Sequence, residues 1–248
     1  MAGTGRNILV IKHGAMGDVI LAQGPFQAIR DHHGDARIVL LTTRPFAAFL
    51  EKSGLFDEVW IDERPKLWQL SKRHIDQLKV AGIETVPPVD FSWAMTDISR
   101  FDLPDKYALL VPGGSAHRPE KRWPAKRFAE LAAILAGKGI TPVLVGGKAE
   151  AEAIKTILDH CPETIDLSSK TEFGDIATLG AGATLAVGND TGPLHLISAV
   201  GCKTVVLFSK ASDPNMSRPR GQDVTVLRED DLANLPLSAV LDSLGLEK

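Results

Sequence analysis

Short apolar runs alternate with helical patterns along this chain, and the alternation limits the folds open to it. In the first part, strands are predicted at 7–12, 37–43 and 57–62, and helices at 19–32 and 45–53. The strand runs are rich in β-branched residues, and the helical stretches are amphipathic. Consecutive parallel strands need a crossover connection, usually a helix, so this alternation predicts a parallel sheet.

A second regular series of strands and helices begins at Tyr107 and is more complete than the first. Its predicted strands lie at 107–111, 141–145, 164–167, 184–187, 203–208 and 224–227. Its predicted helices lie at 125–138, 150–160, 173–180, 193–200 and 237–244. Such a series is typical of a complete doubly wound α/β domain.

The stretch between the two series carries weaker signals. Residues 63–68 are predicted as a loop, 71–81 as a helix, and 86–104 as an irregular linker that contains prolines. We therefore predict an α/β protein with two domains, 1–104 and 105–248. The first domain shows only three strands and is expected to be the smaller.

Charge, cysteine content and hydropathy argue against several functions. A net charge of -3 argues against binding nucleic acid through its phosphates. No apolar run approaches the roughly 20 residues of a membrane span, and residues 1–6 lack the layout of a signal peptide. Cys161 and Cys202 lie far apart and suggest neither a disulfide framework nor a zinc site. We expect a cytoplasmic protein with no metal or cofactor.

The first predicted strand ends at Lys12, and a glycine-bearing turn, His13–Asp18, leads into the first helix. Such a junction places a loop at the carboxyl edge of a parallel sheet, where α/β proteins bind ligands. The turn matches neither the Walker loop nor the Gly-x-Gly-x-x-Gly fingerprint. Asp18 has two interpretations, an acid that stabilises the helix dipole or a general base. The spacing does not decide between them.

A second junction, Gly188–His195, is the most informative part of the second series. A strand that turns directly into a helix leaves free backbone N–H groups, which with the helix dipole form an anion site. Thr191 adds a hydroxyl, Gly192 allows close approach of a ligand, and His195 lies one turn into the helix. The plainer interpretation is an ordinary helix N-cap.

The loop 112–124 follows the strand at Tyr107 and gathers polar groups. It combines a glycine pair with one hydroxyl, Ser115, and three cations, Arg118, Lys121 and Arg122. The cations could neutralise a diphosphate, although a solvated basic loop is the alternative.

A third junction, 143–150, ends at Glu150. Glu150 could cap its helix or accept hydrogen bonds from a ribose diol. Loops that offer cations, N–H groups and a diol acceptor at one sheet edge together indicate a nucleotide ligand.

Four segments resemble glycosyltransferase family 9, the ADP-heptose:lipopolysaccharide heptosyltransferases. They are Ile11–Asp18, Pro112–Trp123, Val145–Glu150 and Gly188–His195. Met-Gly-Asp followed by Asp-Thr-Gly-x-x-His is a fairly specific combination. The resemblance extends over the first sixty residues and nearly all of the second half.

This resemblance implies a GT-B fold, with two Rossmann-like domains and the active site in the cleft between them. It implies an inverting, metal-independent transfer of heptose from ADP-heptose to a hydroxyl of the lipopolysaccharide core, a glycolipid acceptor. Asp18 matches the acid that deprotonates the acceptor, and Lys12 matches a lysine facing the cleft. The matching substrate-binding residues are Gly17, Ser115, Arg118, Lys121, Glu150, Asp190, Thr191, Gly192 and His195. A membrane-embedded acceptor would bring the enzyme into peripheral contact with the inner membrane.

The sequence departs from the family in its first domain. Family members have further strands where Trp68–Ser71 here bridges directly to the helix at His74. Either the acceptor domain is reduced, or residues of the natural protein are missing from this sequence. A nucleotide-binding module without turnover, or a GT-B sugar-nucleotide epimerase, therefore stays an alternative function.

Overall fold

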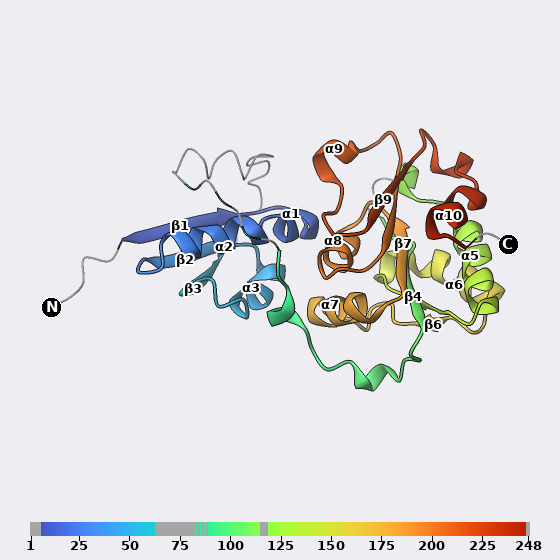
Figure 1. Cartoon of the computed structure of the whole chain (residues 1–248), viewed down its shortest axis with the longest axis horizontal. Helices are drawn as coiled ribbons and strands as arrows, with labels where there is room; N and C mark the ends of the chain where they lie inside the picture. Colours follow the sequence, from blue (N-terminus) through green and yellow to red (C-terminus); the bar gives the residue numbers. More distant parts are fainter. Residues whose placement is uncertain are drawn as a thin grey trace. The chain divides into compact units, whose positions relative to one another are not determined.

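The computed structural model of the chain describes residues 6–62, 83, 85, 87, 89–114 and 119–246. The chain divides into two compact units, Met1–Ala94 and Met95–Lys248, called unit 1 and unit 2 below. Figure 1 shows their elements coloured along the sequence. The helix predicted at 71–81 and the loop predicted at 63–68 lie outside the described residues.

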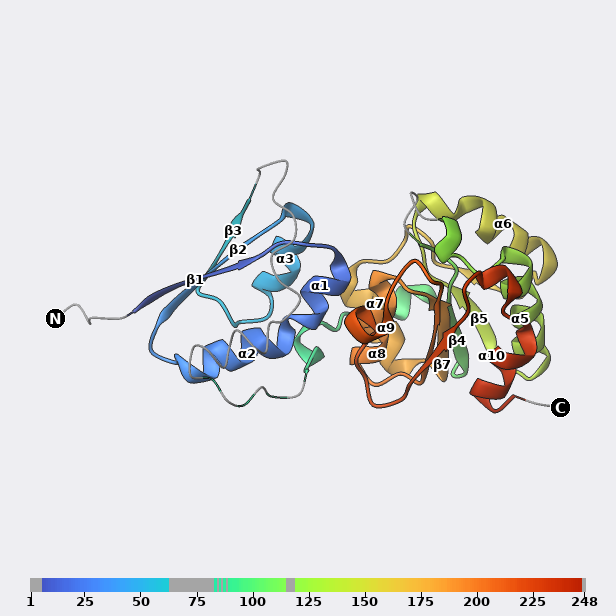
Figure 2. The same ribbon diagram turned by 90° about the horizontal axis from the view of Figure 1, so that it is seen from above.

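Unit 1 contains a parallel sheet of three strands in the order β1-β2-β3. These are β1 (Asn7–Lys12), β2 (Arg37–Thr42) and β3 (Glu58–Ile61). The helices are α1 (Met16–Leu21), α2 (Gln23–His32) and α3 (Arg44–Glu51), and Figure 2 shows α2 lying alongside the strands. Right-handed crossovers that advance in one direction place their helices on one face of the sheet.

The two faces of this sheet differ in burial. Ile38 and Leu40 are completely buried on one face. On the other, Leu9, Ile11 and Trp60 stay about half exposed, at 52%, 49% and 48%. The register places them together, because Ile11 lies opposite Leu41 and Leu41 opposite Trp60.

The single helix predicted at 19–32 is wrong, because the structure divides it at Ala22 into α1 and α2. Pro25 explains the break. Proline has no N–H to donate to the carbonyl of Leu21, four residues earlier, and its ring would clash with that carbonyl. In the first turn of α2, where N–H groups lack helical partners in any case, Pro25 is tolerated.

Three aromatic side chains hold the last residues of unit 1 against α3. Phe49 of α3 lies 6.3 Å from Phe91 and 5.1 Å from Trp93, measured between ring centroids. The Asp90 amide also donates to the side-chain oxygen of Gln23 at 3.3 Å. The chain thereby returns to the helical layer before it enters unit 2.

Unit 2 contains a parallel sheet of six strands in the order β6-β5-β4-β7-β8-β9. The strands are β4 (Tyr107–Val111), β5 (Thr141–Leu144), β6 (Ile165–Asp166), β7 (Leu185–Asn189), β8 (Thr204–Phe208) and β9 (Val224–Arg228). The helices are α5 (Ala125–Gly137), α6 (Ala151–His160), α7 (Phe173–Gly182), α8 (Gly192–Ala199), α9 (Pro214–Ser217) and α10 (Leu237–Leu244). The order reverses at β4 and β7, which is the switch point of a doubly wound sheet.

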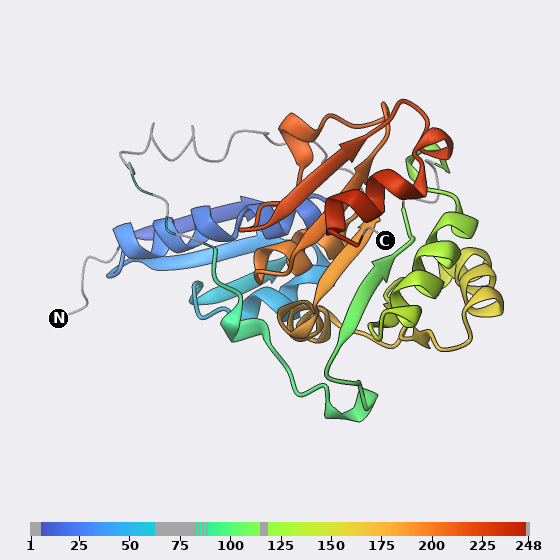
Figure 3. The same ribbon diagram turned by 45° about the vertical axis from the view of Figure 1, so that its right-hand side comes forward.

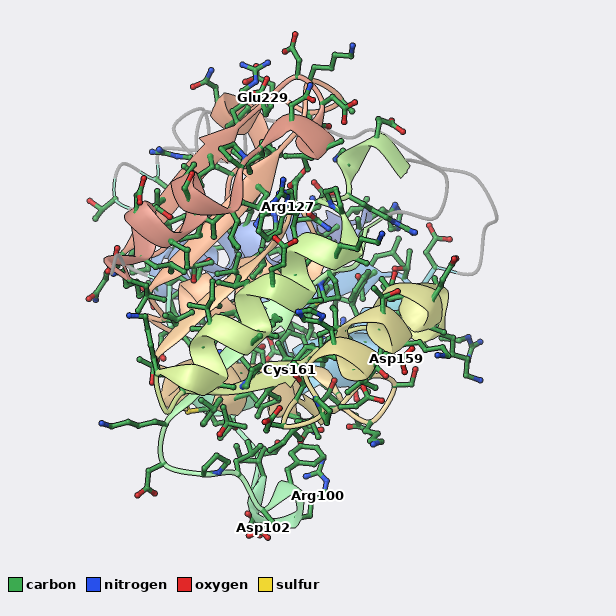
Figure 4. The ribbon with its side chains drawn as sticks, turned by 90° about the vertical axis from the view of Figure 1, so that its right-hand side faces the viewer. Arg100, Asp102, Arg127, Asp159, Cys161 and Glu229 are labelled. Carbon is green, nitrogen blue, oxygen red and sulfur yellow. The ribbon has the colours of Figure 1, made fainter. Side chains whose placement is uncertain are left out.

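The main core of unit 2 lies under α5, α6 and α10. It combines strand residues such as Leu110 and Leu144 with Phe128 of α5, Ile157 of α6 and Val240 of α10. Figure 3 shows the green α5 and the red α10 on one side of the strands. Figure 4 shows α5 and α6 side by side, carrying the labelled Arg127 and Asp159.

The segment before β4 belongs to unit 2 because it bonds to α7. Thr96 donates its hydroxyl to Asp175 at 2.7 Å, and Arg100 donates Nη2 to the same carboxylate at 2.6 Å. The Thr96 amide also bonds to Thr178, at 2.9 Å. Figure 4 labels Arg100 and Asp102 in this segment. The units accordingly divide between residues 94 and 95, whereas the sequence predicts a boundary between 104 and 105.

Short helices and strand ends account for the remaining differences. The sequence gives no sign of α9, which has only four residues. The strand predicted at 184–187 extends to Asn189, so that Asn189 ends β7 instead of belonging to the turn. Among the described residues, no helix is both long and apolar enough to cross a membrane.

Candidate functional site

The carboxyl ends of three neighbouring strands in unit 2, β5, β4 and β7, carry the predicted polar loops. Since β5, β4, β7 and β8 are adjacent, the loops that follow them lie along one edge of the sheet. In a doubly wound sheet, ligands bind at this edge, beside the switch point.

A lysine and two other side chains meet at this edge. Lys121 Nζ donates to Asp190 Oδ2 at 2.6 Å, and Ser212 Oγ donates to the same oxygen at 2.8 Å. The side chains of Lys121 and Asp190 are only 13% and 9% exposed. Asp190 therefore holds a partly buried cation at the end of β7, where an anionic ligand could compete for it.

Asn189, the last residue of β7, connects two segments that follow β4. Its Nδ2 donates to the carbonyls of Pro112 and Gly113 at 2.8 and 3.0 Å. Its Oδ1 accepts from the amide of Trp123 at 2.9 Å. Because Asn189 is completely buried, these bonds lie away from solvent.

The amino end of α8 lies directly after Asp190. Thr191 is the N-cap residue with extended backbone, yet its side chain does not cap the helix. The Thr191 hydroxyl oxygen is buried, and no hydrogen-bond partner for it occurs among the described residues. Gly192 opens the helix, and the buried His195 lies in its first turn. Free N–H groups, the helix dipole and a hydroxyl thus coincide here, as in an anion site.

Glu150 closes the loop after β5. Its Oε2 accepts from the Gly147 amide at 2.7 Å, which is a capping contact. A Cβ placed on Gly113 would lie 2.9 Å from Glu150 Cγ, so the glycine lets the carboxylate pack against the loop after β4. One carboxylate oxygen of Glu150 therefore caps the helix, which is the first of the two roles that the sequence suggests for this residue.

Gly188 is required by the pairing of β4 and β7. It lies opposite Val111 in the register, and a Cβ would come within 2.6 Å of the Val111 carbonyl oxygen. The glycine brings the two strand ends close enough for Asn189 to reach Pro112.

The unit 1 turn is held locally. Asp18, at the third position of α1, is exposed and accepts from the Ala15 amide at 3.0 Å. Gly14 has a φ of 134°, a conformation that favours glycine, and Asp18 closes over it. In the structure, Asp18 thus makes the backbone contact expected of an acid in the first turn of a helix.

Lys12, at the end of β1, is 6% exposed. Burial lowers the pKa of Lys12 below its ordinary value, and the negative charge of Asp18 opposes that shift. Next to it, His13 Nε2 lies 3.0 Å from Asp62 Oδ2, just beyond β3. The turn thus gathers a buried cation and an exposed carboxylate.

The predicted residues fall into three groups. Lys121, Glu150, Asp190, Thr191, Gly192 and His195 lie at the ligand edge of unit 2, and Lys12, Gly17 and Asp18 lie at the turn after β1. Ser115 and Arg118 lie outside the described residues. Within the part of the chain that the structure describes, no three His, Cys, Asp or Glu side chains are placed to hold a metal ion.

Sequence reasoning missed two contributors to this edge. Ser212 follows a strand that the sequence predicts, but nothing in the sequence shows that this strand lies beside β7. Asn189 lies inside the Gly188–His195 motif, and its contacts reach residues 66 and 77 positions away. The sequence signal that could have found both residues is a polar side chain at or soon after the end of a predicted strand.

The chain matches the model of one protein family, Glycosyltransferase family 9 (heptosyltransferase), over residues 72–244. Lipooligosaccharide heptosyltransferase 2 of Haemophilus influenzae is 29% identical over 120 residues, which cover 46% of this chain and 34% of that protein. Lipopolysaccharide heptosyltransferase 1 of Escherichia coli is 30% identical over 142 residues, covering 56% and 44%. The chain thus spans less than half the length of these curated relatives.

Solved structures resemble the fold closely. The ADP-heptose LPS heptosyltransferase II of Escherichia coli has a TM-score of 0.78 at 18% identity, covering 96% of this chain and 97% of that one. The Escherichia coli heptosyltransferase WaaC with ADP has a TM-score of 0.73 at 18% identity, covering 96% and 99%. These similarities confirm the predicted α/β fold of the GT-B type, here in a reduced form.

Proposed function

The chain belongs to glycosyltransferase family 9, the heptosyltransferase family, and we propose that it transfers a heptose from ADP-heptose to a hydroxyl group of the lipopolysaccharide core. The observation that carries this proposal is the cluster of Lys121, Asp190 and Ser212 beside the amino end of α8. A cation, free N–H groups and a buried hydroxyl together suit a nucleoside diphosphate.

We assign donor binding to unit 2. The pyrophosphate takes over Lys121 from Asp190, and Thr191 and the N–H groups of α8 donate to its oxygens. Glu150, which uses Oε2 for capping, offers its other oxygen to the ribose diol. Gly192 and His195 line the same turn, and Ser115 and Arg118 add a hydroxyl and a cation from the loop after β4.

We assign acceptor activation to unit 1. Asp18 takes the proton of the acceptor hydroxyl as that oxygen attacks the anomeric carbon from the face opposite ADP. The bond between the anomeric carbon and the phosphate oxygen breaks, and ADP leaves with its electron pair, so the configuration inverts. Lys12 steadies the Asp18 carboxylate, and Gly17 lets the acceptor approach it.

Lys121 and the α8 N–H groups stabilise the charge that develops on the leaving diphosphate, which makes the reaction independent of metal. We place the reaction in the cytoplasm; because the proposed acceptor is a glycolipid, the protein meets the inner membrane peripherally.

Calorimetric titration with ADP and with UDP tests the donor site. We expect wild-type protein to prefer ADP, and Lys121→Ala to bind ADP at least about tenfold more weakly, because it loses a charge-assisted contact. Lys155→Ala is the matched control, since it also removes a Lys–Asp pair, with Asp159, but on the exposed surface of α6. Equal affinity of both variants would remove the assignment of Lys121.

The transfer assay with ADP-heptose and lipopolysaccharide core acceptor then separates the candidate functions. ADP binding without release of ADP or transfer of heptose would favour a binding module, as the small unit 1 would also allow. Conversion of a UDP-N-acetylhexosamine without any acceptor would favour an epimerase. Transfer with inversion supports the proposal.

A further inference from the structure

Asn189 is a completely buried side chain whose hydrogen-bonding groups all point at the loop that carries Lys121. We propose that Asn189 is a positioning residue that fixes the backbone on both sides of this loop and so holds Lys121 where a donor phosphate binds. The phosphate part rests on the proposed function. The anchoring part concerns the free protein alone.

The first step of the argument is the end of the strand pairing. The register of β4 and β7 stops at Val111 and Gly188. The carbonyls of Pro112 and Gly113 lie beyond it, and Asn189 Nδ2 donates to both. A side chain thus continues the sheet hydrogen bonds past the last backbone pair, at a point where an unmade bond would be costly.

The second step concerns the far side of the loop. Trp123 follows Lys121 by two residues, and its amide donates to Asn189 Oδ1. The Trp123 ring is 2% exposed, its Nε1 donates to the Leu235 carbonyl at 3.0 Å, and it packs edge-on against Phe128. The backbone next to Lys121 is therefore fixed by Asn189 as well as by the core.

Asn189, the last residue of β7, and Asp190, the residue after it, hold different parts of Lys121. Asn189 holds the backbone near Lys121, and Asp190 holds its ammonium group at 2.6 Å. Only an amide side chain supplies two N–H donors and one oxygen acceptor at once. Aspartate would set a carboxylate against two carbonyls, alanine would leave all three groups without partners, and glutamine is too long for a buried position.

Three variants test the proposal. Asn189→Ala removes all three bonds. Asn189→Asp has nearly the same size and keeps an oxygen that can accept from the Trp123 amide, but it loses both donors to Pro112 and Gly113. If the alanine variant does not fold, the ADP and adenosine affinities of Asn189→Asp, with the same expected losses, test the positioning. Tyr107→Phe is the matched control, because it removes a buried hydrogen bond, 2.8 Å to the Leu179 carbonyl, at the opposite end of β4.

Amide hydrogen exchange in the ligand-free protein measures how firmly Asn189 holds the loop backbone. We expect the Trp123 amide to exchange at least about tenfold faster in Asn189→Ala than in wild type, because it loses a buried acceptor. Tyr107→Phe leaves that rate unchanged. Unchanged exchange at Trp123 in Asn189→Ala would overturn the proposal, whether or not the protein binds ADP.

The affinities for ADP and adenosine test whether Asn189 positions Lys121 for a phosphate. We expect Asn189→Ala to bind ADP about tenfold more weakly while its affinity for adenosine, which lacks phosphate, changes less than about twofold. Combined with Lys121→Ala, Asn189→Ala should add little further loss, because both act through one contact. Full additivity, or equal losses for ADP and adenosine, would overturn the positioning role. A wild type that binds no ADP would refute the proposed function, while the exchange result still decides the anchoring.

Discussion

The candidate residues of unit 1 and unit 2 are held in place over very different distances along the chain. Asp18 accepts from Ala15, three residues away, within one turn of exposed backbone. Lys121 meets Asp190 across 69 residues, and Asn189 reaches Pro112 across 77. A local turn positions the candidate base, whereas the pairing of distant strands positions the candidate phosphate site.

Burial separates the two units in the same way. Strand residues of unit 2 such as Leu109 and Leu110 point to opposite faces of the sheet and are both completely buried. In unit 1, Leu40 is completely buried but Leu9 is half exposed. From this comparison we expect a substitution at Asp18 to change the reaction rate without changing the stability of the protein. In unit 2 the site residues are bonded to the buried core, so a substitution there should change both.

Asp18→Asn should produce the largest effect. Loss of a general base lowers turnover by about 10²–10⁴-fold, whereas ADP affinity and the melting temperature stay near wild type, because the turn is exposed. Initial rates with ADP-heptose, with calorimetry on the same samples, measure both quantities. Asp31→Asn is the control, since it alters an exposed acid of α2 whose side chain bonds, among the described residues, only to Gln27. A loss of ADP affinity equal to the loss of rate would contradict the separation of roles.

Leu40→Ala should destabilise unit 1 by about 2–5 kcal/mol, because it opens a cavity in a packed face. Leu9→Ala, on the half-exposed face of the same sheet, should cost less than about 1 kcal/mol. Urea unfolding followed by tryptophan fluorescence compares the two. Equal losses would show that both faces of this sheet are packed alike in solution.

Thiol labelling adds a reporter for unit 2 alone. Cys161 and Cys202 are both buried there, and burial raises the pKa of Cys202 to about 12, which leaves almost no thiolate at neutral pH. Since each unit has its own core, Leu40→Ala should leave the labelling rate of both cysteines near wild type. Accelerated labelling would show that the units unfold together.

Asp175→Asn should cost about 1–3 kcal/mol, because the carboxylate accepts from Thr96, Arg100 and the Glu172 amide. Burial alone would raise the pKa of Asp175, but these bonds outweigh it and hold that pKa below its ordinary value. The stabilisation is therefore present above about pH 4 and is lost as the pH falls further.

Urea unfolding between pH 3 and pH 7 checks this dependence. The difference in stability between wild type and Asp175→Asn should shrink toward the acid end. Asp102→Asn, in the same segment, serves as the control, because the Asp102 side chain makes no hydrogen bond to any other described residue. A constant difference across the range would contradict the linkage.

Arg37→Ala should have the smallest effect. Arg37 pairs with Glu58 across β2 and β3, and both side chains are nearly half exposed. Solvent screens such pairs, so the urea midpoint should stay within the error of wild type. A clear loss would mean that surface pairs, and not only the covered face, hold the small sheet together.

Helices and strands could be predicted where apolar residues recur with a clear helical or strand periodicity. Tyr107–Val111 and Leu237–Leu244 have the predicted bounds. The break at Ala22 was not foreseen, because the helical pattern of apolar residues continues past Pro25. Motif residues such as Asp190 and Lys121 could be found because they follow predicted strands. Their pairing could not, because it depends on which strands become neighbours, and that is decided by packing of the whole sheet.

The tie between Asn189 and Pro112 also bears on how the protein is made. During synthesis from the amino end, β4 leaves the ribosome long before β7 exists, so the carbonyls after β4 wait for a partner 77 residues later. Contacts this distant in sequence close late and slowly. Until then the half-made sheet exposes the strand edge against which β7 will lie, and a chaperone that binds unpaired strands would find its target there.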